Sequence, residues 1–390
     1  MTGPDRSRDE RPGKTAGSGL RILEVTNIDF ALRQFLHPLM RVLRDGGHHV
    51  EGACAEGSHL LPVREDGFVV HGLPMARSFN PLAQYRALRA LVRLIRETRP
   101  DLVHAHMPIS GFLARMAAWW CNVPLVAYTC HGFLFNQPGS YRRRLLSFVL
   151  EYLAGQVTDR YMTVSQEEAR DARRLGISPR AIAVGNGRDP ALFHPDRDAR
   201  AEIRAALGVP DRAVVIVAVS RLVRHKGYPE LLRAMESVPG AMLWIVGERL
   251  PSDHGDTMAQ EFSHAETVLG PRLRCLGYRD DIPRLLAAAD IFTLPSHFEG
   301  LPMSIIEAML CGLPVVATDI RGPREQIVPE ETGLLVPPGL AAPLAGALNR
   351  FVEDPAFRER AGQAGLLRAR ALYTQDAVLT RVRALLTGES

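Results

Sequence analysis

Two glutamates near residue 300 are spaced so that they could bind hydroxyl groups on either side of an anion. Glu299 lies in a turn, and eight residues later Glu307 lies in a short predicted helix that starts at Pro302 and ends at Gly312. At a rise of ~1.5 Å per residue, Glu307 lies roughly 8 Å along the axis from that start. The helix N-terminus between the glutamates offers unpaired N–H groups and a partial positive charge, which attract phosphate. A nucleotide sugar has this order of groups: sugar hydroxyls, diphosphate and ribose hydroxyls.

The glutamate pair by itself leaves a structural explanation open. The apolar stripe of the predicted helix consists of Ile305, Ile306, Met309 and Leu310, and Glu307 points away from that stripe. Glu307 could therefore be an ordinary solvated side chain. A second group of residues favours the binding interpretation.

A lone lysine follows a predicted buried strand. Only two of the 47 basic residues are lysines, and one of them, Lys226, lies in the segment SRLVRHKG after the strand AVVIVAV at 213–219. Open α/β sheets bind ligands at the carboxyl ends of their strands. A lysine kept among so many arginines indicates a need for a compact ammonium rather than a guanidinium fork. Lys226 and its neighbour Arg221 are therefore predicted to face an anionic group, with a solvated turn as the alternative.

Together these segments resemble the retaining glycosyltransferases of family 4, which have the GT-B fold. The matching segments are SRLVRHKG at 220–227, the E-x7-E pair Glu299/Glu307, TDIRG at 318–322 and ETGLLVPPG at 331–339. The resemblance covers nearly the whole chain after residue 20 and is more specific in the C-terminal half. It implies an α/β protein of the GT-B class, in which two Rossmann-like, doubly wound parallel-sheet domains face a central cleft.

The resemblance also implies a role for each group of residues. The cations after the 213–219 strand would neutralise the departing diphosphate, Glu307 would hold the ribose, and Glu299 with the next two backbone N–H groups would hold the sugar. The histidine after the strand VAYT would face the reacting carbon of that sugar. The expected catalytic residues are His131, Arg221, Lys226 and Glu299. The expected substrate-binding residues are Glu307, Gly300, Leu301, Tyr278, Arg279 and Asn186.

The chain departs from the family pattern at two places. Asn186-Gly187 matches the family's turn before the linker, but Arg188 follows where the family often has an aliphatic residue. The loop predicted after the first strand, Thr26–Gln34, lacks the Gly-Gly that touches the donor phosphate in many members, so phosphate or acceptor contacts are not carried over to it. The pattern Phe35-x-x-Pro38 instead resembles a branch that extends lipid-linked sugars.

Strand and helix patterns alternate along both halves of the chain, which indicates parallel sheets covered on both faces. The strands predicted first are 20–26, 49–55, 69–73, 101–106, 124–129, 160–164 and 181–184, and the first helices are 35–44, 82–98, 111–121 and 141–155, with another from Gln166. The pattern restarts with strands at 213–219, 241–246, 272–276, 290–294, 313–317 and 333–336. We expect a disordered tail (1–20), an N-terminal acceptor-side domain (21–190), a C-terminal nucleotide-sugar domain (191–372), and a segment (373–390) whose helix 376–386 crosses back to the N-terminal domain.

Several other functions are disfavoured. A dehydrogenase would carry G-x-G-x-x-G after a first strand, and neither half does. His104 and His106 share one face of a strand, but no carboxylate or further ligand with metal-type spacing accompanies them in the sequence, and the family resemblance implies no bound metal and no cofactor. The expected alternative is that one of them caps the strand near the cleft. No basic motif interleaved with aromatics indicates nucleic acid.

Charge and cysteine content indicate the compartment. Residues 21–190 carry 21 basic and 15 acidic side chains, whereas residues 191–390 carry 22 and 25. Arginines recur along the helix 82–98 and at Arg142–Arg144, so an anionic membrane surface is a possible partner, with a solvated helix face as the alternative. Five cysteines without metal-type spacing, no leader segment and no apolar run of about 18 residues favour a cytoplasmic protein, with peripheral attachment to the inner face of the cell membrane as the further option.

The sequence therefore predicts a hexosyl- or N-acetylhexosaminyltransferase that uses a nucleoside-diphosphate sugar, with UDP as the expected nucleotide. The expected acceptor is a polyprenyl-diphosphate-linked saccharide in bacterial surface polysaccharide or glycan assembly. Two alternatives stay open: transfer to a soluble small molecule, and a non-catalytic binding subunit with the same fold. The intact set of Glu299, Glu307, Arg221 and Lys226 argues against the second.

Overall fold

The protein is described by a computed structural model that covers residues 19–75, 80–137, 139–210, 212–249, 253 and 257–389. The predicted disordered tail lies, up to residue 18, outside the described residues. The chain forms two compact units, one of Met1–Tyr128, Val157–Arg160 and Arg383–Ser390, the other of Thr129–Gln156 and Tyr161–Val382. The predicted domain boundaries and the predicted path of the C-terminal helix stay predictions.

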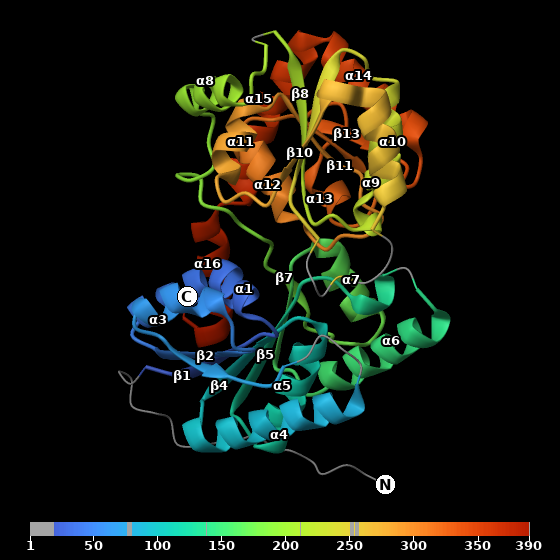
Figure 1. Ribbon diagram of the computed structural model, residues 1–390. Helices are drawn as coiled ribbons and strands as arrows, with labels where there is room; N and C mark the ends of the chain where they lie inside the picture. Colours follow the sequence, from blue (N-terminus) through green and yellow to red (C-terminus); the bar gives the residue numbers. More distant parts are fainter. Residues whose placement is uncertain are drawn as a thin grey trace. The chain divides into compact units, whose positions relative to one another are not determined.

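Within the described residues, seven strands form one parallel sheet in the order β3-β2-β1-β4-β5-β6-β7 (Figure 1). Buried and exposed residues do not alternate regularly along these strands, as expected for a sheet that helices cover on both faces. The strands are β1 Arg21–Val25, β2 His49–Cys54, β3 Val69–Gly72, β4 Leu102–His106, β5 Leu125–Cys130, β6 Arg160–Thr163 and β7 Ile182–Ala183. The helices are α1 Asp29–Ala31, α2 His37–Asp45, α3 Leu61–Glu65, α4 Pro81–Thr98, α5 Pro108–Trp120, α6 Tyr141–Gly155 and α7 Gln166–Arg174.

Six described strands form the second sheet in the order β10-β9-β8-β11-β12-β13, which is the Rossmann order 3-2-1-4-5-6. The strands are β8 Val214–Val219, β9 Ala241–Val246, β10 Leu273–Gly277, β11 Ile291–Leu294, β12 Val315–Thr318 and β13 Gly333–Val336. The helices are α8 Arg197–Ala206, α9 Tyr228–Glu236, α10 Ala259–Leu269, α11 Ile282–Ala288, α12 Met303–Leu310, α13 Pro323–Gln326, α14 Ala341–Glu353, α15 Pro355–Leu372 and α16 Gln375–Thr387.

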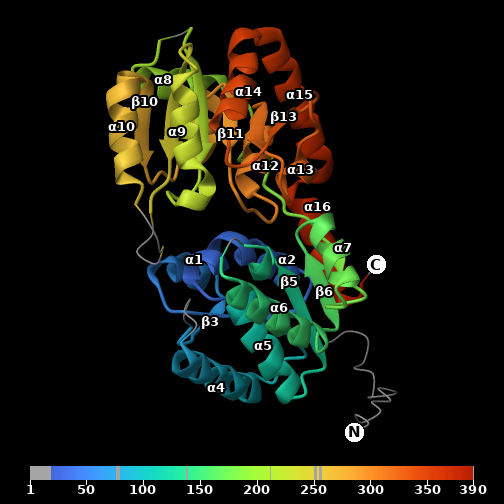
Figure 2. The same cartoon turned by 90° about the vertical axis from the view of Figure 1, so that its right-hand side faces the viewer.

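Successive residues of β8 enter two different cores. Val215 and Val217 pack with residues of α11, α12 and α15, whereas Ile216 and Ala218 pack with residues of α9, α10 and α14. Successive side chains of a strand point to opposite faces, so the sheet is buried on both sides, and helices flank it in Figure 2. This double burial explains why AVVIVAV is continuously apolar. The predicted doubly wound α/β architecture is confirmed.

The segment predicted as a loop after the first strand is mostly helical. Asp29–Ala31 is α1, and residues Leu32–Leu36 continue it as a π-helical turn into α2. The segment contains no glycine or proline that would interrupt a helix, and Asp29 lies in its first turn, where a negative charge is favourable. The Asp29 carboxylate also accepts hydrogen bonds from the backbone N–H of His59 at 3.1 Å and from its ring at 2.9 Å.

The described helices include none that is both long enough and apolar enough to cross a lipid bilayer.

Candidate functional site

The predicted helix around Glu307 is α12, and its ends differ slightly from the prediction. Pro302 has an extended ψ of 124° and is the N-cap, so the helix begins one residue later, at Met303. At the other end Gly312, with φ +78°, follows the C-cap residue Cys311. Its N–H donates to the Met309 carbonyl at 2.9 Å, which closes the helix as a glycine in this position commonly does. The first backbone N–H groups of α12 therefore follow directly after Glu299–Leu301.

Lys226 and Glu299 form an ion pair. The Lys226 Nζ donates to Glu299 Oε1 at 2.6 Å, and the two side chains are only 16% and 10% exposed. Gly227 permits this approach: its φ is +78°, and a Cβ there would lie 1.9 Å from the Pro295 carbonyl oxygen. The turn after β8 can thus lie directly against the chain that leaves β11. The structure brings together two predicted site residues from different motifs.

The turn at His131-Gly132 lies against the loop that contains Glu299 and Gly300. A Cβ at Gly300 would be 2.8 Å from the His131 carbonyl oxygen, so the two backbones meet there without a side chain between them. Gly322 of the TDIRG segment also lies against Gly300, because a Cβ at Gly322 would lie 2.0 Å from the Gly300 carbonyl oxygen. Three segments that are distant in sequence therefore meet at Gly300.

Glu307 is buried, so the interpretation of Glu307 as a solvated side chain is wrong. The residue is 7% exposed, and its Oε1 accepts a hydrogen bond from the Nε of Arg188 at 2.6 Å. Arg188 is the residue at which the chain departs from the family pattern. A buried carboxylate needs such a partner, because an unpaired charge in the interior is costly.

Asn186 also contacts the loop before α12. Its side-chain amide donates to the Leu301 carbonyl oxygen at 2.7 Å. The Leu301 side chain is 3% exposed and belongs to the core that α11 and α12 share. The Leu301 backbone is therefore held by Asn186 and its side chain by the core, which fixes the position of the chain just before α12.

Arg221 lies in the same turn as Lys226 but pairs elsewhere. Its guanidinium donates to the carboxylate of Asp253, and its side chain is 43% exposed. His225 lies between the two cations in sequence. Its pKa is lowered to about 4, first by burial and then by the positive charges of Lys226 and Arg221. His225 is therefore neutral at pH 7 and adds no charge to this turn.

Tyr278 and Arg279, which follow β10, make a different local arrangement. Tyr278 is exposed, and Arg279 donates twice to the Asp281 carboxylate, at 2.7 and 2.6 Å. That ion pair fixes the residue before α11. Their predicted position beside a nucleotide base stays a prediction.

Two family models match successive parts of the chain. The model described as "Glycosyl transferase 4-like domain" matches residues 31–187, and "Glycosyl transferases group 1" matches residues 199–368. This chain is a GT-B glycosyltransferase of the family 4 type.

Individual relatives agree with this assignment. The chain is 29% identical over 312 residues to an Escherichia coli UDP-Gal:alpha-D-GlcNAc-diphosphoundecaprenol alpha-1,3-galactosyltransferase, covering 77% of this chain and 79% of the relative. It is 24% identical over 352 residues to a Campylobacter jejuni N,N'-diacetylbacillosaminyl-diphospho-undecaprenol alpha-1,3-N-acetylgalactosaminyltransferase, covering 87% and 91%. The crystal structure of Anabaena Alr3699/HepE in complex with UDP has a TM-score of 0.81 at 23% identity, covering 95% of this chain and 100% of that one. That likeness shows the same fold.

Sequence reasoning missed Glu168 as a neighbour of the glycosyltransferase's His131 turn. Its Oε1 accepts a hydrogen bond from the Phe133 N–H at 3.2 Å, directly after Gly132, and its buried Oε2 has no hydrogen-bond partner among the residues that the structure describes. Burial raises the pKa of Glu168 to about 8. The pattern Ser165-x-x-Glu168 is a capping box, and the Ser165 hydroxyl does accept from the Glu168 N–H at 3.2 Å. In this case, however, the carboxyl reaches a distant turn instead of its own N-cap.

The expectation that no carboxylate accompanies His104 and His106 is wrong. Glu24 on β1 is the register partner of His104 on β4, and its oxygens lie 3.0 Å from His104 Nδ1 and 2.9 Å from His106 Nε2. Burial alone would raise the pKa of Glu24, but the charges and hydrogen bonds of both histidines lower it to about 2. An ionised carboxylate only accepts hydrogen bonds, so both rings donate to it. Among the described residues these three form a group whose ligand atoms lie close enough together to hold a metal ion, and the same atoms hydrogen-bond to one another.

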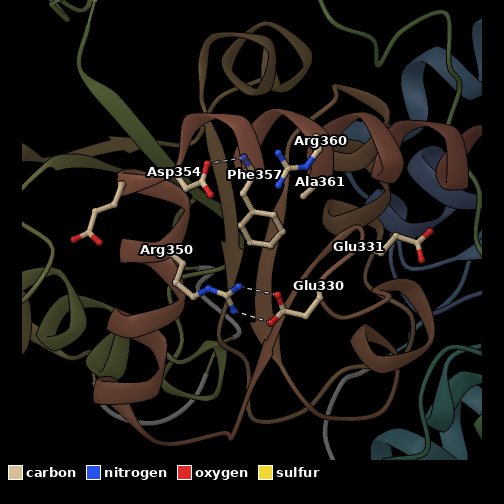
Figure 3. A pocket seen from close by; sticks show the side chains of 8 residues that line it. Glu330, Glu331, Arg350, Asp354, Phe357, Arg360 and Ala361 are labelled. Carbon is tan, nitrogen blue, oxygen red and sulfur yellow. Dashed lines mark hydrogen bonds and ion pairs between the residues drawn. The ribbon is translucent and has the colours of Figure 1, made fainter.

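A surface depression of roughly 540 Å³ is lined by residues of α14 and α15 and by Glu330 and Glu331 (Figure 3). Arg350 donates to both oxygens of Glu330 at 2.7 Å, and the Asp354 carboxylate accepts from the Phe357 N–H at 2.9 Å. Three of its charged side chains are thus engaged: Arg350 and Glu330 with each other, and Asp354 with a helix N-terminus. None of the sequence-predicted site residues lines it.

Proposed function

We propose that this glycosyltransferase moves a hexosyl or N-acetylhexosaminyl group, with retention of anomeric configuration, from a UDP-sugar to a polyprenyl-diphosphate-linked saccharide. The observation that carries the proposal is the Lys226–Glu299 ion pair directly before the N-terminus of α12. In this proposal the cation, the carboxylate that binds hydroxyls and the first N–H groups of the helix bind successive parts of a sugar diphosphate.

In this proposal the protein stabilises charge that develops on the leaving diphosphate. The Lys226 ammonium and the first N–H groups of α12 receive that charge, and Arg221 joins them by exchanging Asp253 for phosphate oxygens. Glu299 binds sugar hydroxyls, and the His131 turn, packed on Gly300, faces the anomeric carbon. We assign no covalent nucleophile.

We also propose that no metal ion takes part. The cations of the turn after β8 and the dipole of α12 can neutralise a diphosphate by themselves. Transfer should therefore persist when the enzyme is assayed with a chelator such as EDTA. Loss of transfer with EDTA, restored by a divalent cation, would contradict this part of the proposal.

The acceptor is proposed from the relatives and from one helix surface. The names of the E. coli and C. jejuni relatives specify diphosphoundecaprenol-linked acceptors. On α6 the exposed apolar residues are Tyr141, Leu145, Leu146, Val149, Tyr152 and Leu153. Exposed Arg142 and Arg143 accompany them, which suits a helix lying on an anionic lipid surface. The helix α4 buries Ala87, Leu91, Leu94 and Ile95 and exposes the apolar side chains of Leu82 and Tyr85 near its start.

The proposal is tested with a thermal-shift screen of UDP-, GDP- and ADP-sugars, followed by transfer assays on polyprenyl-diphosphate saccharides. A ligand that binds only the native protein raises its melting temperature. We expect the largest shift with a UDP-sugar and an α-configured product from an α-configured donor. The variant Lys226→Arg keeps the charge but not the compact ammonium, so it should recover only part of the transfer that is lost in Lys226→Ala. A β product, or binding without turnover on every acceptor, would refute retention or catalysis respectively.

A further inference from the structure

Arg188 is the one residue of the candidate site that departs from the family pattern and yet contacts a predicted binding residue. Its guanidinium Nε donates to Glu307 Oε1 at 2.6 Å, and the two side chains are 13% and 9% exposed. The two residues are 119 positions apart in the sequence. A charge pair this well shielded from water is sensitive to geometry and leaves a costly unpaired charge if one partner is removed.

The backbone of Arg188 is held independently of its side chain. Its N–H donates to the Tyr373 carbonyl at 3.0 Å, and its carbonyl accepts from the Gln375 N–H at 2.9 Å. The chain at this point is therefore pinned to the junction between α15 and α16. A change of the side chain alone leaves these hydrogen bonds in place, so the guanidinium can be tested separately from the fold.

The contact uses one oxygen of the carboxylate. Arg188 engages Oε1, and within the described part of the chain no hydrogen bond to Glu307 Oε2 is found. Glu307 is near the end of α12, where its own carbonyl accepts from the Cys311 N–H at 3.1 Å. One oxygen is thus fixed by an ion pair, and the other can accept from a ligand hydroxyl.

We infer that Arg188 is a nucleotide-positioning residue, which orients the Glu307 carboxylate so that Oε2 receives the ribose hydroxyls of the donor. The inference rests on the proposed function, since it takes Glu307 as the ribose-binding residue. Arg188 acts through Glu307 rather than by touching the diphosphate. Its contribution to affinity is therefore present only when the ligand carries the ribose hydroxyls.

Calorimetric titration with UDP and with its 2′-deoxy and 3′-deoxy analogues tests this dependence. A hydrogen bond to a charged group is worth ~1.5–3 kcal/mol, so the wild type should bind UDP roughly 10- to 100-fold more tightly than an analogue lacking the bonded hydroxyl. In Arg188→Met, UDP binding should weaken by a similar factor and deoxy-analogue binding should barely change. The ratio between the two ligands then falls toward one. Arg188→Lys should restore part of the ratio, and Arg360→Met, an exposed change, should leave it intact.

The outcomes separate the possible failures. If Arg188→Met weakened the binding of UDP and of both deoxy analogues equally, Arg188 would act on the diphosphate and the inference would be wrong. If Arg188→Met changed none of these affinities, the ratio would also stay at its wild-type value and the inference would be wrong. If Arg188→Met did not fold, the ratio of UDP affinity to deoxy-analogue affinity would be measured for Arg188→Lys and for Glu307→Gln instead. Both ratios should lie below the wild-type ratio. If the wild type bound none of UDP, GDP and ADP, the proposed function would fail, and this inference with it. If GDP or ADP bound best, the same comparison would use its deoxy analogues.

Discussion

Replacing Glu168 with glutamine should change how the stability of the protein depends on pH. Burial raises the pKa of Glu168 from 4.5 to about 8, so the carboxyl is neutral in the folded protein at pH 7 and ionised in the unfolded chain. Between these values the folded state holds one proton more than the unfolded state, and stability therefore falls as pH rises. The stabilisation that the protonated Glu168 contributes to the folded state is complete below pH 4.5 and is lost by about pH 8.

The expected magnitude follows from the two pKa values. At about 1.36 kcal/mol per pH unit, the interval from 4.5 to about 8 corresponds to a loss on the order of 5 kcal/mol. Glutamine keeps the side-chain oxygen that accepts from the Phe133 N–H but does not titrate. The Glu168→Gln protein should therefore gain stability relative to the wild type as pH rises through this window.

Urea unfolding of both proteins at several pH values from 4.5 to 8.5 measures this difference. Other titrating groups, such as buried His106 with its pKa of about 4, contribute equally to both proteins and cancel. Glu353→Gln, at an exposed position, is the matched control and should show no trend. A difference between Glu168→Gln and wild type that stayed constant across this range would refute the reasoning.

Three further predictions concern the site and the surface. Lys226→Ala and Arg221→Ala should each lower kcat by about 10²–10³ while the circular dichroism spectrum stays native, because each removes a donor to the departing diphosphate; a folded Lys226→Ala enzyme with near-normal kcat would disprove the assignment. Glu307→Gln should weaken UDP binding in calorimetry, whereas Glu299→Gln should mainly lower the transfer rate; the reverse result would exchange the two roles. Sedimentation with anionic vesicles should show binding at low salt that declines at high salt and in Leu145→Glu on α6, but not in the exposed control Leu340→Glu; a protein that stays in the supernatant at low salt would exclude lipid docking through α6.

Local patterns were sufficient for the architecture. Apolar strands such as 213–219 and 241–246 and the periodic helix 141–155 depend on neighbouring residues in the chain, and the structure has them at nearly the same bounds. The segment Thr26–Gln34 was predicted wrongly as a loop between the first strand and the helix 35–44. Its residues lack any helix breaker, and the helix α1 forms there together with the π-helical turn that continues it.

The sequence by itself determined which side chains are available for chemistry: the spacing of Glu299 and Glu307, the lone Lys226 after a buried strand, and the family that these motifs resemble. Only the tertiary structure decided their partners. Lys226 pairs with Glu299, which lies 73 positions away in the sequence, and His104 pairs with Glu24, which lies 80 positions away. Such pairs follow from strand order and from the close approach of glycine backbones, which a local pattern does not encode. For the same reason the sequence left Glu307 equally free to be solvated or buried, until folding placed Arg188 against it.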